Sequence, residues 1–314
     1  MGPKNVVVRE MMPGDLSDAT RIFRAAFGTF LGVPDVGTFR LDLGTIGTRF
    51  ATDPGAALVA ERDGRIIGSI FGMDWGSQFV VGPLTVDPAC WKQGVARLLT
   101  AEILAVAERR SATLVSLFTF PQSASHLRLY EGFGFAPMFL TPVMDKPAGS
   151  APSPISGRLF SRLAPTEQVT LLEASHQLTS ASFSGLDLRR EIGAIETQRL
   201  GETILLDDAA GLAGVALCHI GRGTEAGDAT LFVKFAAVRP GAGTDFDRLL
   251  DAVEGLAAKR GMQRIAAGVS TGRRDAYRRM VARGFRAGLV GVAMHRPDGP
   301  GTLRPDLYII DDWR

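Results

Sequence analysis

The 314-residue sequence has few cysteines, no long apolar run and almost no net charge. Its two cysteines, Cys90 and Cys218, lie far apart, and neither has a second cysteine or a histidine at ligand spacing. This spacing argues against a disulfide framework and against a zinc site, so we expect no metal. No stretch of about 18 apolar residues occurs, which argues against a membrane partner. The N-terminus lacks the apolar segment of a signal peptide, so we expect a cytoplasmic protein.

Neither sign of charge dominates. Lysine and arginine total 35 against 33 aspartate and glutamate, which leaves a formal net charge of +2. This balance gives no electrostatic argument for a nucleic-acid partner. With 46% hydrophobic and 22% charged residues, the composition excludes a disordered or fibrous chain. The length favours two domains, because a single core rarely grows past roughly 250–300 residues.

A segment rich in proline, glycine and small polar residues divides the chain near its midpoint. It reads Lys146-Pro-Ala-Gly-Ser-Ala-Pro-Ser-Pro-Ile155 and cannot form a helix or a central strand. The sequence therefore predicts a first domain over residues 1–146, a linker over 147–156 and a second domain over 157–314.

The two halves repeat one order of elements. Each contains a strand, a glycine-containing loop, a helix, a second strand and a short helix that ends in Gly-Phe. In the first half, the strand spans 79–86, the helix 95–107 and the second strand 113–120, and the short helix ends at Gly134-Phe135. In the second half, the same elements span 230–238, 246–258 and 264–269, and the short helix ends at Gly284-Phe285. Because the spacing is nearly the same, we predict a duplicated fold.

The start of the first half completes this unit. The pattern predicts a strand over 5–9, a helix from Asp15 or Ser17 to about Phe30, and strands over 57–61, 65–73 and 78–86. An antiparallel meander would then precede a strand–helix–strand crossover. The predicted fold class is mixed α+β, with two domains that each hold a twisted, mostly antiparallel sheet flanked by helices.

The loop after Val86 carries the first chemical signal. Small residues, Gly94 and Ala96, stand where the predicted helix begins, and Lys92 adds a cation. The unpaired N–H groups and the dipole of a helix start favour anions. The loop lacks the lysine–serine/threonine pair of a P-loop and the three glycines of a dinucleotide fingerprint. On its own, an ordinary strand-to-helix turn explains the pattern equally well.

A second motif, which follows the loop in the sequence, makes the loop more informative. The segment Leu129-Tyr130-Glu131-Gly132-Phe133-Gly134-Phe135 follows the loop Trp91-Lys92-Gln93-Gly94-Val95-Ala96. In this order the two resemble the signatures of the GNAT family of acyl-CoA-dependent N-acyltransferases, which are Arg/Gln-x-x-Gly-x-Gly/Ala and Leu-Tyr-x-x-x-Gly-Phe. The resemblance covers about residues 4–145. It departs at Trp91, where the family prefers arginine or glutamine.

The resemblance implies a binding mode for acetyl-CoA as cosubstrate. Its pyrophosphate would accept hydrogen bonds from the loop and the helix start, and its pantetheine arm would pair with the preceding strand where the sheet splays. The residues implied are Trp91, Lys92, Gln93, Gly94, Val95, Ala96 and Arg97 for the loop, and Leu84, Thr85 and Val86 for the strand. A backbone N–H near Val86 would stabilise the oxyanion.

Tyr130 is the candidate general acid under this resemblance. A tyrosine with a pKa near 10 keeps its proton at neutral pH and can donate it to a leaving thiolate. A structural aromatic that packs under the helix is the alternative. Ser123 and His126 are expected to face the cofactor arm. His126 is also a candidate proton carrier, although an ordinary half-exposed histidine at a helix start explains it equally well.

No general base is evident from the sequence. No Asp or Glu occurs between Gln78 and Val86, and Asp74 and Glu131 are weak candidates. The amine could instead lose its proton through water. A further hypothesis takes the base from the apolar tail that ends the chain, as Asp311, Asp312 or the carboxylate of Arg314.

The second half lacks the corresponding functional residues. Aligned on the helices, Asp245 and Asp247 fall near the positions of Gly94 and Ala96, where carboxylates would repel a pyrophosphate. Met280 takes the place of Tyr130. We therefore predict a degenerate C-terminal copy that keeps the fold and lacks acetyl-CoA chemistry. An arginine-rich stretch over 273–286 is predicted to form a solvated helix.

The sequence thus predicts a tandem GNAT-like acetyltransferase. It would move an acetyl group from acetyl-CoA to a primary amine of a small molecule or peptide by direct transfer. A non-catalytic acyl-CoA-binding or sensing protein is the alternative, and a protein-interaction scaffold is a third reading. A homodimer is a further expectation.

Overall fold

The computed structural model describes residues 5–149 and 155–311. Part of the predicted linker and two residues of the tail hypothesis, Asp312 and Arg314, lie outside this part of the chain. No helix within the described ranges is long and apolar enough to cross a membrane.

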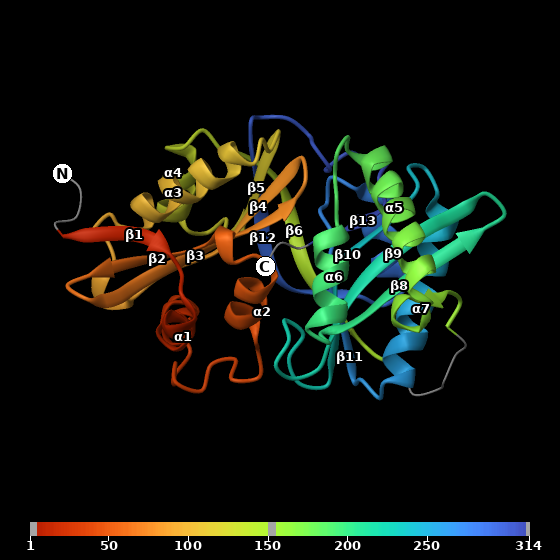
Figure 1. Cartoon of the computed structure of the whole chain (residues 1–314), viewed down its shortest axis with the longest axis horizontal. Helices are drawn as coiled ribbons and strands as arrows, with labels where there is room; N and C mark the ends of the chain where they lie inside the picture. Colours follow the sequence, from red (N-terminus) through yellow and green to blue (C-terminus); the bar gives the residue numbers. More distant parts are fainter. Residues whose placement is uncertain (1–4, 150–154, 312–314) are drawn as a thin grey trace.

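The first half contains four helices and six strands among its described residues (Figure 1). In chain order these are β1 Val6–Glu10, α1 Leu16–Phe30, α2 Thr45–Thr52, β2 Ala57–Arg62, β3 Arg65–Trp75, β4 Gln78–Val86, α3 Val95–Arg109, β5 Leu114–Thr119, α4 Ala124–Glu131 and β6 Ala136–Pro147. Every predicted element of this half is present. Helix α2 was not predicted, because its sequence, with three threonines and Gly47, has low helix propensity.

The second half repeats this order. Its elements are β7 Arg158–Leu159, α5 Pro165–Ser182, α6 Arg189–Thr197, β8 Gly201–Asp208, β9 Gly211–Ile220, β10 Thr230–Val238, α7 Gly243–Lys259, β11 Arg264–Gly268, α8 Arg274–Ala282, β12 Arg286–Arg296 and β13 Ile309–Ile310. From β10 to β12 each element matches one between β4 and β6. The duplicated arrangement and the mixed, mostly antiparallel fold class are confirmed.

Local sequence explains the elements around the site. The turn between β2 and β3 is Asp63-Gly64, and both residues have positive φ, as the tight turns of hairpins require. Helix α1 buries Ala19, Ile22 and Ala26, whose spacing places them on one face of the helix. The strongly apolar strand β4 is buried along most of its length.

Exchanged strands join the halves into one sheet. The strand order is β1-β2-β3-β4-β5-β12-β6-β11-β10-β9-β8-β7. Strand β12 of the second half pairs with β5, as Val292 opposite Thr119 shows, and β6 of the first half pairs with β11. Each half therefore supplies the strand that lies beside the crossover of the other. The domain boundary near residue 146 stays a prediction, with β6 integral to both halves.

Helices cover both faces of this sheet. Along β3, Phe71, Met73 and Trp75 alternate onto one face, where α1, α2, α5 and α6 pack. Ile67 and Ile70 point to the other face and pack with α3 and α4. The core beneath α7 and α8 belongs to the second half.

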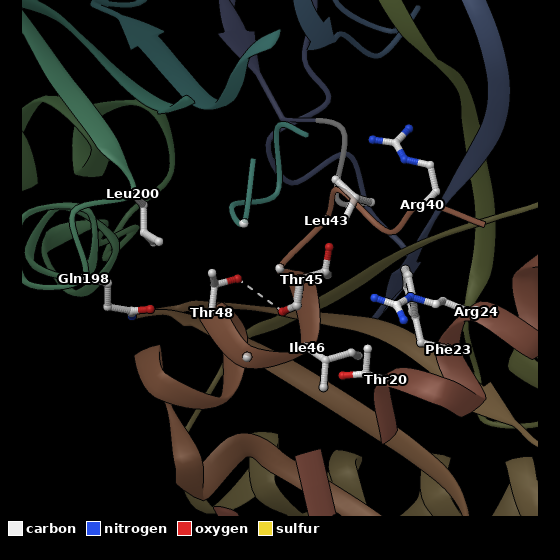
Figure 2. A pocket seen from close by; sticks show the side chains of 13 residues that line it. Thr20, Phe23, Arg24, Arg40, Leu43, Thr45, Ile46, Thr48, Gln198 and Leu200 are labelled. Carbon is white, nitrogen blue, oxygen red and sulfur yellow. Dashed lines mark hydrogen bonds between the residues drawn. The ribbon is translucent and has the colours of Figure 1, made fainter. Parts of the chain in front are cut away.

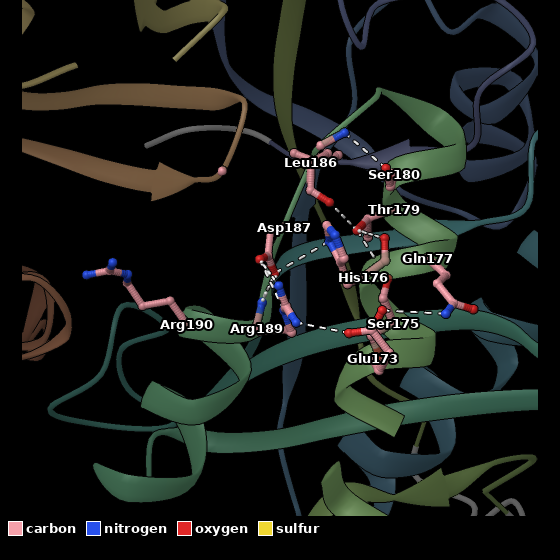
Figure 3. Close-up of polar contacts among 12 residues, drawn as sticks. Glu173, Ser175, His176, Gln177, Thr179, Ser180, Leu186, Asp187, Arg189 and Arg190 are labelled. Atoms are coloured by element: carbon pink, nitrogen blue, oxygen red, sulfur yellow. Dashed lines mark hydrogen bonds and ion pairs between the residues drawn. The ribbon is translucent and has the colours of Figure 1, made fainter. Parts of the chain in front are cut away.

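The loop between α5 and α6 docks on the turn between β3 and β4 (Figure 3). The backbone N–H of Ser77 donates to Gly185 O at 2.9 Å, and the N–H of Asp187 donates to Trp75 O at 3.0 Å. Within the second half, the hydroxyl of Thr179 on α5 donates to Leu186 O, which fixes the loop against its own helix. The backbone of this loop thus attaches the second half to the meander of the first.

A buried chain of charges crosses the junction between the halves. Arg49 of α2 pairs with Glu225 at 2.8 Å, and Lys234 of β10 pairs with Glu225 at 2.8 Å and with Glu191 at 3.0 Å. The indole Nε1 of Trp75 donates to Glu191 at 3.1 Å. All four charged side chains are almost completely buried, so each needs its partners to offset desolvation.

His219 lies close to these buried charges, and its titration makes the stability of the fold depend on pH. Burial and the charge of Lys234 lower its pKa to about 4. An unfolded histidine binds its proton near pH 6.5, so between pH 6.5 and 4 the unfolded state holds more protons than the folded state. Stability therefore falls as the pH falls through this window.

We predict that the free energy of unfolding decreases by up to about 1.4 kcal/mol per pH unit below pH 6.5 because of His219. Urea denaturation at a series of pH values measures this slope. His219→Gln should flatten it between pH 6.5 and 4.5. Equal slopes for the variant and the wild type would contradict the assignment.

Candidate functional site

The parallel strands β4 and β5 separate part-way along their length. They pair from Gln78 opposite Leu114 to Val81 opposite Leu117 and no further. Beyond that point Leu84, Thr85 and Val86 pair with β3 alone, after a register shift between Ile70 and Gly72. Among the described residues, the edge of β4 that faces β5 therefore pairs with no strand over these three residues, at the position predicted to splay.

The loop after β4 presents a row of unpaired backbone donors. Gly94 has a φ of 85° and forms the N-cap of α3, a conformation that suits glycine. Within the described structure, the N–H groups of residues 92–96 have no hydrogen-bond acceptor. The N–H of Arg97, also expected to be a donor, is used within the helix by Gly94 O at 3.1 Å. Five donors at the positive end of a helix form an anion site.

Side chains hold the loop and leave its backbone exposed. The indole Nε1 of Trp91 donates to Val86 O at 2.7 Å, which ties the loop to the end of β4. The Gln93 amide donates to Ala89 O at 3.0 Å and accepts from Arg62 at 2.8 Å. Lys92 is exposed beside this row. Trp91, the departure from the family motif, thus has a bracing role in the loop.

Tyr130 lies at the end of α4 and is 8% exposed. It belongs to the same buried cluster as Val86 and Leu117, which border the separation of the strands. Burial raises its pKa, so the phenol stays protonated well above neutral pH. Its hydroxyl makes no hydrogen bond with another described residue. The group is therefore a proton donor without an internal acceptor.

His126 and Ser123 occupy the first turn of α4. The hydroxyl of Ser123 accepts from the His126 N–H at 3.4 Å and caps the helix. The imidazole packs against Phe30, with ring centroids 5.0 Å apart, and against Phe120, with centroids 6.2 Å apart. Burial lowers the pKa of His126, so the ring is neutral at pH 7.

The structure argues against two of the candidate bases. Asp74 is held by Arg110 at 3.2 Å and by Arg190 of the second half at 3.5 Å. Asp311 forms a bidentate ion pair with Arg273, and both side chains are completely buried in the second half. Arg273 was predicted to be solvated, and that prediction is wrong because the C-terminal tail covers it.

That tail fills the second copy of the strand separation. Strand β10 pairs with β11 over four residues and then separates, as β4 does from β5. Ile310 and Ile309 pair with Ala236 and Ala237, which hold the positions of Leu84 and Thr85 in the first half. On the other side, the Asp311 N–H donates to Gly268 O of β11 at 3.1 Å.

Arg273 holds the tail in place from the position that Ser123 has in the first half. Its Nη1 donates to Ile309 O at 2.8 Å, and its Nε donates to Thr302 O at 2.8 Å. The adjacent glycine loop is also occupied, since the Gly241 N–H donates to Asp306 O at 3.0 Å. In the second half, backbone groups of this strand edge and of the glycine loop are thus paired with the chain's own tail.

The helix starts and ends of the two copies differ as well. Helix α7 begins at Gly243, and Asp245 and Asp247 in its first turns pair with Arg248 and Arg279. Met280 makes the backbone contact with Phe285 that Tyr130 makes with Phe135. It is fully buried and offers no proton donor.

A cavity of about 440 Å³ lies between the halves (Figure 2). Its walls come from α1, from residues 40 and 43–48 at the start of α2, and from Gln198, Leu200 and Gly223 of the second half. Sequence reasoning missed this cavity, because no local pattern shows that Gln198 and α2 are neighbours. No group of three or more histidine, cysteine or acidic residues suited to a metal occurs among the described residues.

Residues 21–135 match the family model of the acetyltransferase (GNAT) family. The match lies within the first half of the chain. A mycothiol acetyltransferase from Cellulomonas flavigena is 30% identical over 166 residues, which are 48% of this chain and 46% of that protein. One from Thermomonospora curvata is 33% identical over 138 residues, 42% of this chain and 45% of that protein. The chain thus spans about half the length of these relatives.

Solved structures share the GNAT fold over nearly the whole chain. A putative acetyltransferase from Pyrococcus horikoshii has a TM-score of 0.71 at 14% identity and covers 100% of this chain and 96% of its own. A tandem GNAT protein from the clavulanic acid biosynthesis pathway has a TM-score of 0.55 at 15% identity. The match covers 94% of this chain and 99% of that one. At these identities the likeness concerns the fold alone.

The charge chain beside the site gives a stability prediction. Glu225→Gln removes the carboxylate that Arg49 and Lys234 share, and breaking a buried ion pair by removing one partner costs about 3–5 kcal/mol. Urea denaturation should show this loss in the free energy of unfolding. Asp18→Asn, at an exposed ion pair with Arg21, is the control and should cost under about 1 kcal/mol. Equal losses in the two variants would contradict the prediction.

Proposed function

We propose that the first half is an N-acetyltransferase that moves an acetyl group from acetyl-CoA to a primary amine by direct transfer. One observation carries the proposal: the five unpaired N–H groups at residues 92–96 lie at the start of α3, directly after the open edge of β4. The row suits a pyrophosphate, and the open edge suits the amide groups of a pantetheine arm.

Different residues of the chain would contribute to different parts of the acetyl transfer. Acetyl-CoA supplies a thioester, whose carbonyl carbon would form a bond with the amine nitrogen while its bond to sulfur breaks. The proton that the amine loses would pass to water. A backbone N–H near Val86 would stabilise the carbonyl oxygen. Tyr130, protonated because burial raises its pKa, would donate its proton to the departing thiolate. Its hydroxyl has no hydrogen-bond partner within residues 5–149 and 155–311, which supports this role over pure packing.

The relatives' names support acetyl transfer. We carry over the reaction and leave the acceptor open, since the match spans about half of those proteins. A non-catalytic sensor would bind acetyl-CoA without releasing free thiol when amines are supplied. Thiol release therefore distinguishes the enzyme from a sensor.

We further propose that the second half does not bind acetyl-CoA. Its own strand β13 pairs where a pantetheine arm would pair, and its glycine loop donates to the tail. Asp245 and Asp247 would repel a pyrophosphate at the start of α7. Met280 supplies no proton.

Tyr130→Phe should lower kcat about 10–1000-fold and change the affinity for acetyl-CoA much less, because it removes a proton donor and keeps the ring. Steady-state thiol release measures kcat, and calorimetry measures the affinity. Tyr277→Phe in α8 is the matched control and should keep full activity. An unchanged kcat in Tyr130→Phe would refute the role of general acid.

Calorimetry should find one acetyl-CoA per chain. Ala96→Asp places a carboxylate at the start of α3, as Asp247 does in α7, and should weaken binding at least about tenfold at low salt. Ala101→Asp, at an exposed position of the same helix, is the control and should bind normally. Two sites per chain, or equal effects of the two variants, would contradict the assignment.

A further inference from the structure

The cavity between the halves has a distinctive charge. Two arginines, Arg24 and Arg40, belong to its lining, and no carboxylate does. Arg40 pairs with Asp42 at 3.4 Å. Arg24 is half-buried on α1 and makes no hydrogen bond or ion pair with any residue in the described ranges. The cavity therefore holds a guanidinium that no carboxylate of residues 5–149 or 155–311 compensates.

The opposite wall adds donors without acceptors (Figure 2). Thr45, the first residue of α2, is 8% exposed, and its hydroxyl has no hydrogen-bond partner among the described residues. The N–H groups of residues 45–47 belong to the first turn of α2 and have no acceptor there, whereas the N–H of Thr48 donates to Gly44 O at 2.9 Å. Arg24, this hydroxyl and these amides line one space.

The cavity adjoins the open separation of β4 and β5 by two routes. Arg49, next to the lining residue Thr48, donates through Nη1 to Gly82 O where β4 leaves β5. Phe23 of the lining packs on Phe27 with centroids 5.0 Å apart, and Phe27 packs on Phe120 at the end of β5 with centroids 6.4 Å apart. Contacts through Arg49 and Phe27 therefore connect the walls of the cavity to the strand separation.

We propose that the acceptor is an amine that also bears a carboxylate or phosphate, and that this cavity binds the anionic group. The inference rests on the proposed function. Arg24 pairs with the anion, and Thr45 with the first amides of α2 donates to its remaining oxygens. Because Gln198 and Leu200 close the cavity, the second half completes the acceptor site. Polycationic acceptors are disfavoured by the two guanidinium groups.

Matched pairs of amines test this assignment. Thiol release and calorimetry are compared for tyrosine and tyramine, for phosphoethanolamine and ethanolamine, and for spermidine. We expect at least one anionic member to have a kcat/KM and an affinity at least tenfold more favourable than those of its neutral partner. The pair that responds distinguishes a carboxylate from a phosphate. Tighter binding or faster acetylation of spermidine or of the neutral members would overturn the proposal.

A substitution of Arg24 tests the binding of the anionic group separately from the proposed acetyl transfer. Arg24→Gln should raise KM for the anionic amine at least tenfold, with kcat, the affinity for acetyl-CoA and the neutral amine unaffected. Arg65→Gln, at the exposed start of β3, is the control and should change nothing. Equal effects on both amines would overturn the inference. If no amine releases thiol, the proposed function fails, and calorimetry of the same pairs still decides what the cavity binds.

Discussion

The exchange of β6 and β12 is the constraint on which the rest of the structure depends. Strand β12 closes the first crossover and β6 closes the second, so neither half has a complete sheet without the other. This pairing brings α2 and α6 together over one face and buries the ion pairs of Arg49, Glu225 and Lys234 between them. The cavity beside α2 exists because the halves meet in this register.

Both copies separate two parallel strands at the same place, and they fill the opening differently. In the first half no described strand pairs with the side of Leu84–Val86 that faces β5. In the second, β13 supplies the missing pairing, with Arg273 and Asp311 buried beside it. A polypeptide strand and a pantetheine arm offer the same amide groups to a sheet edge. The tail therefore occupies, in the second copy, the place of the sheet edge that pairs with no strand in the first.

Local sequence patterns were sufficient to predict the repeated unit and to place the motifs within it. Strand β4 spans the residues expected, and Gly94 caps α3 where a small residue was needed. The failures concern contacts between distant segments. Arg273 looked like one more surface arginine because nothing near it in sequence reveals the tail that covers it. Helix α2 owes its stability to packing at the junction, since its own residues favour a helix weakly.

Because the exchanged strands belong to one polypeptide, their pairing does not depend on the protein concentration. Two separate chains that traded strands would lose the pairing on dilution, and the edge of β5 would then be exposed. Here the two partners are tethered, so the effective concentration of β12 at β5 is fixed by the chain itself. The edge of β5 is protected at any dilution of the protein, as in a dimer that cannot dissociate.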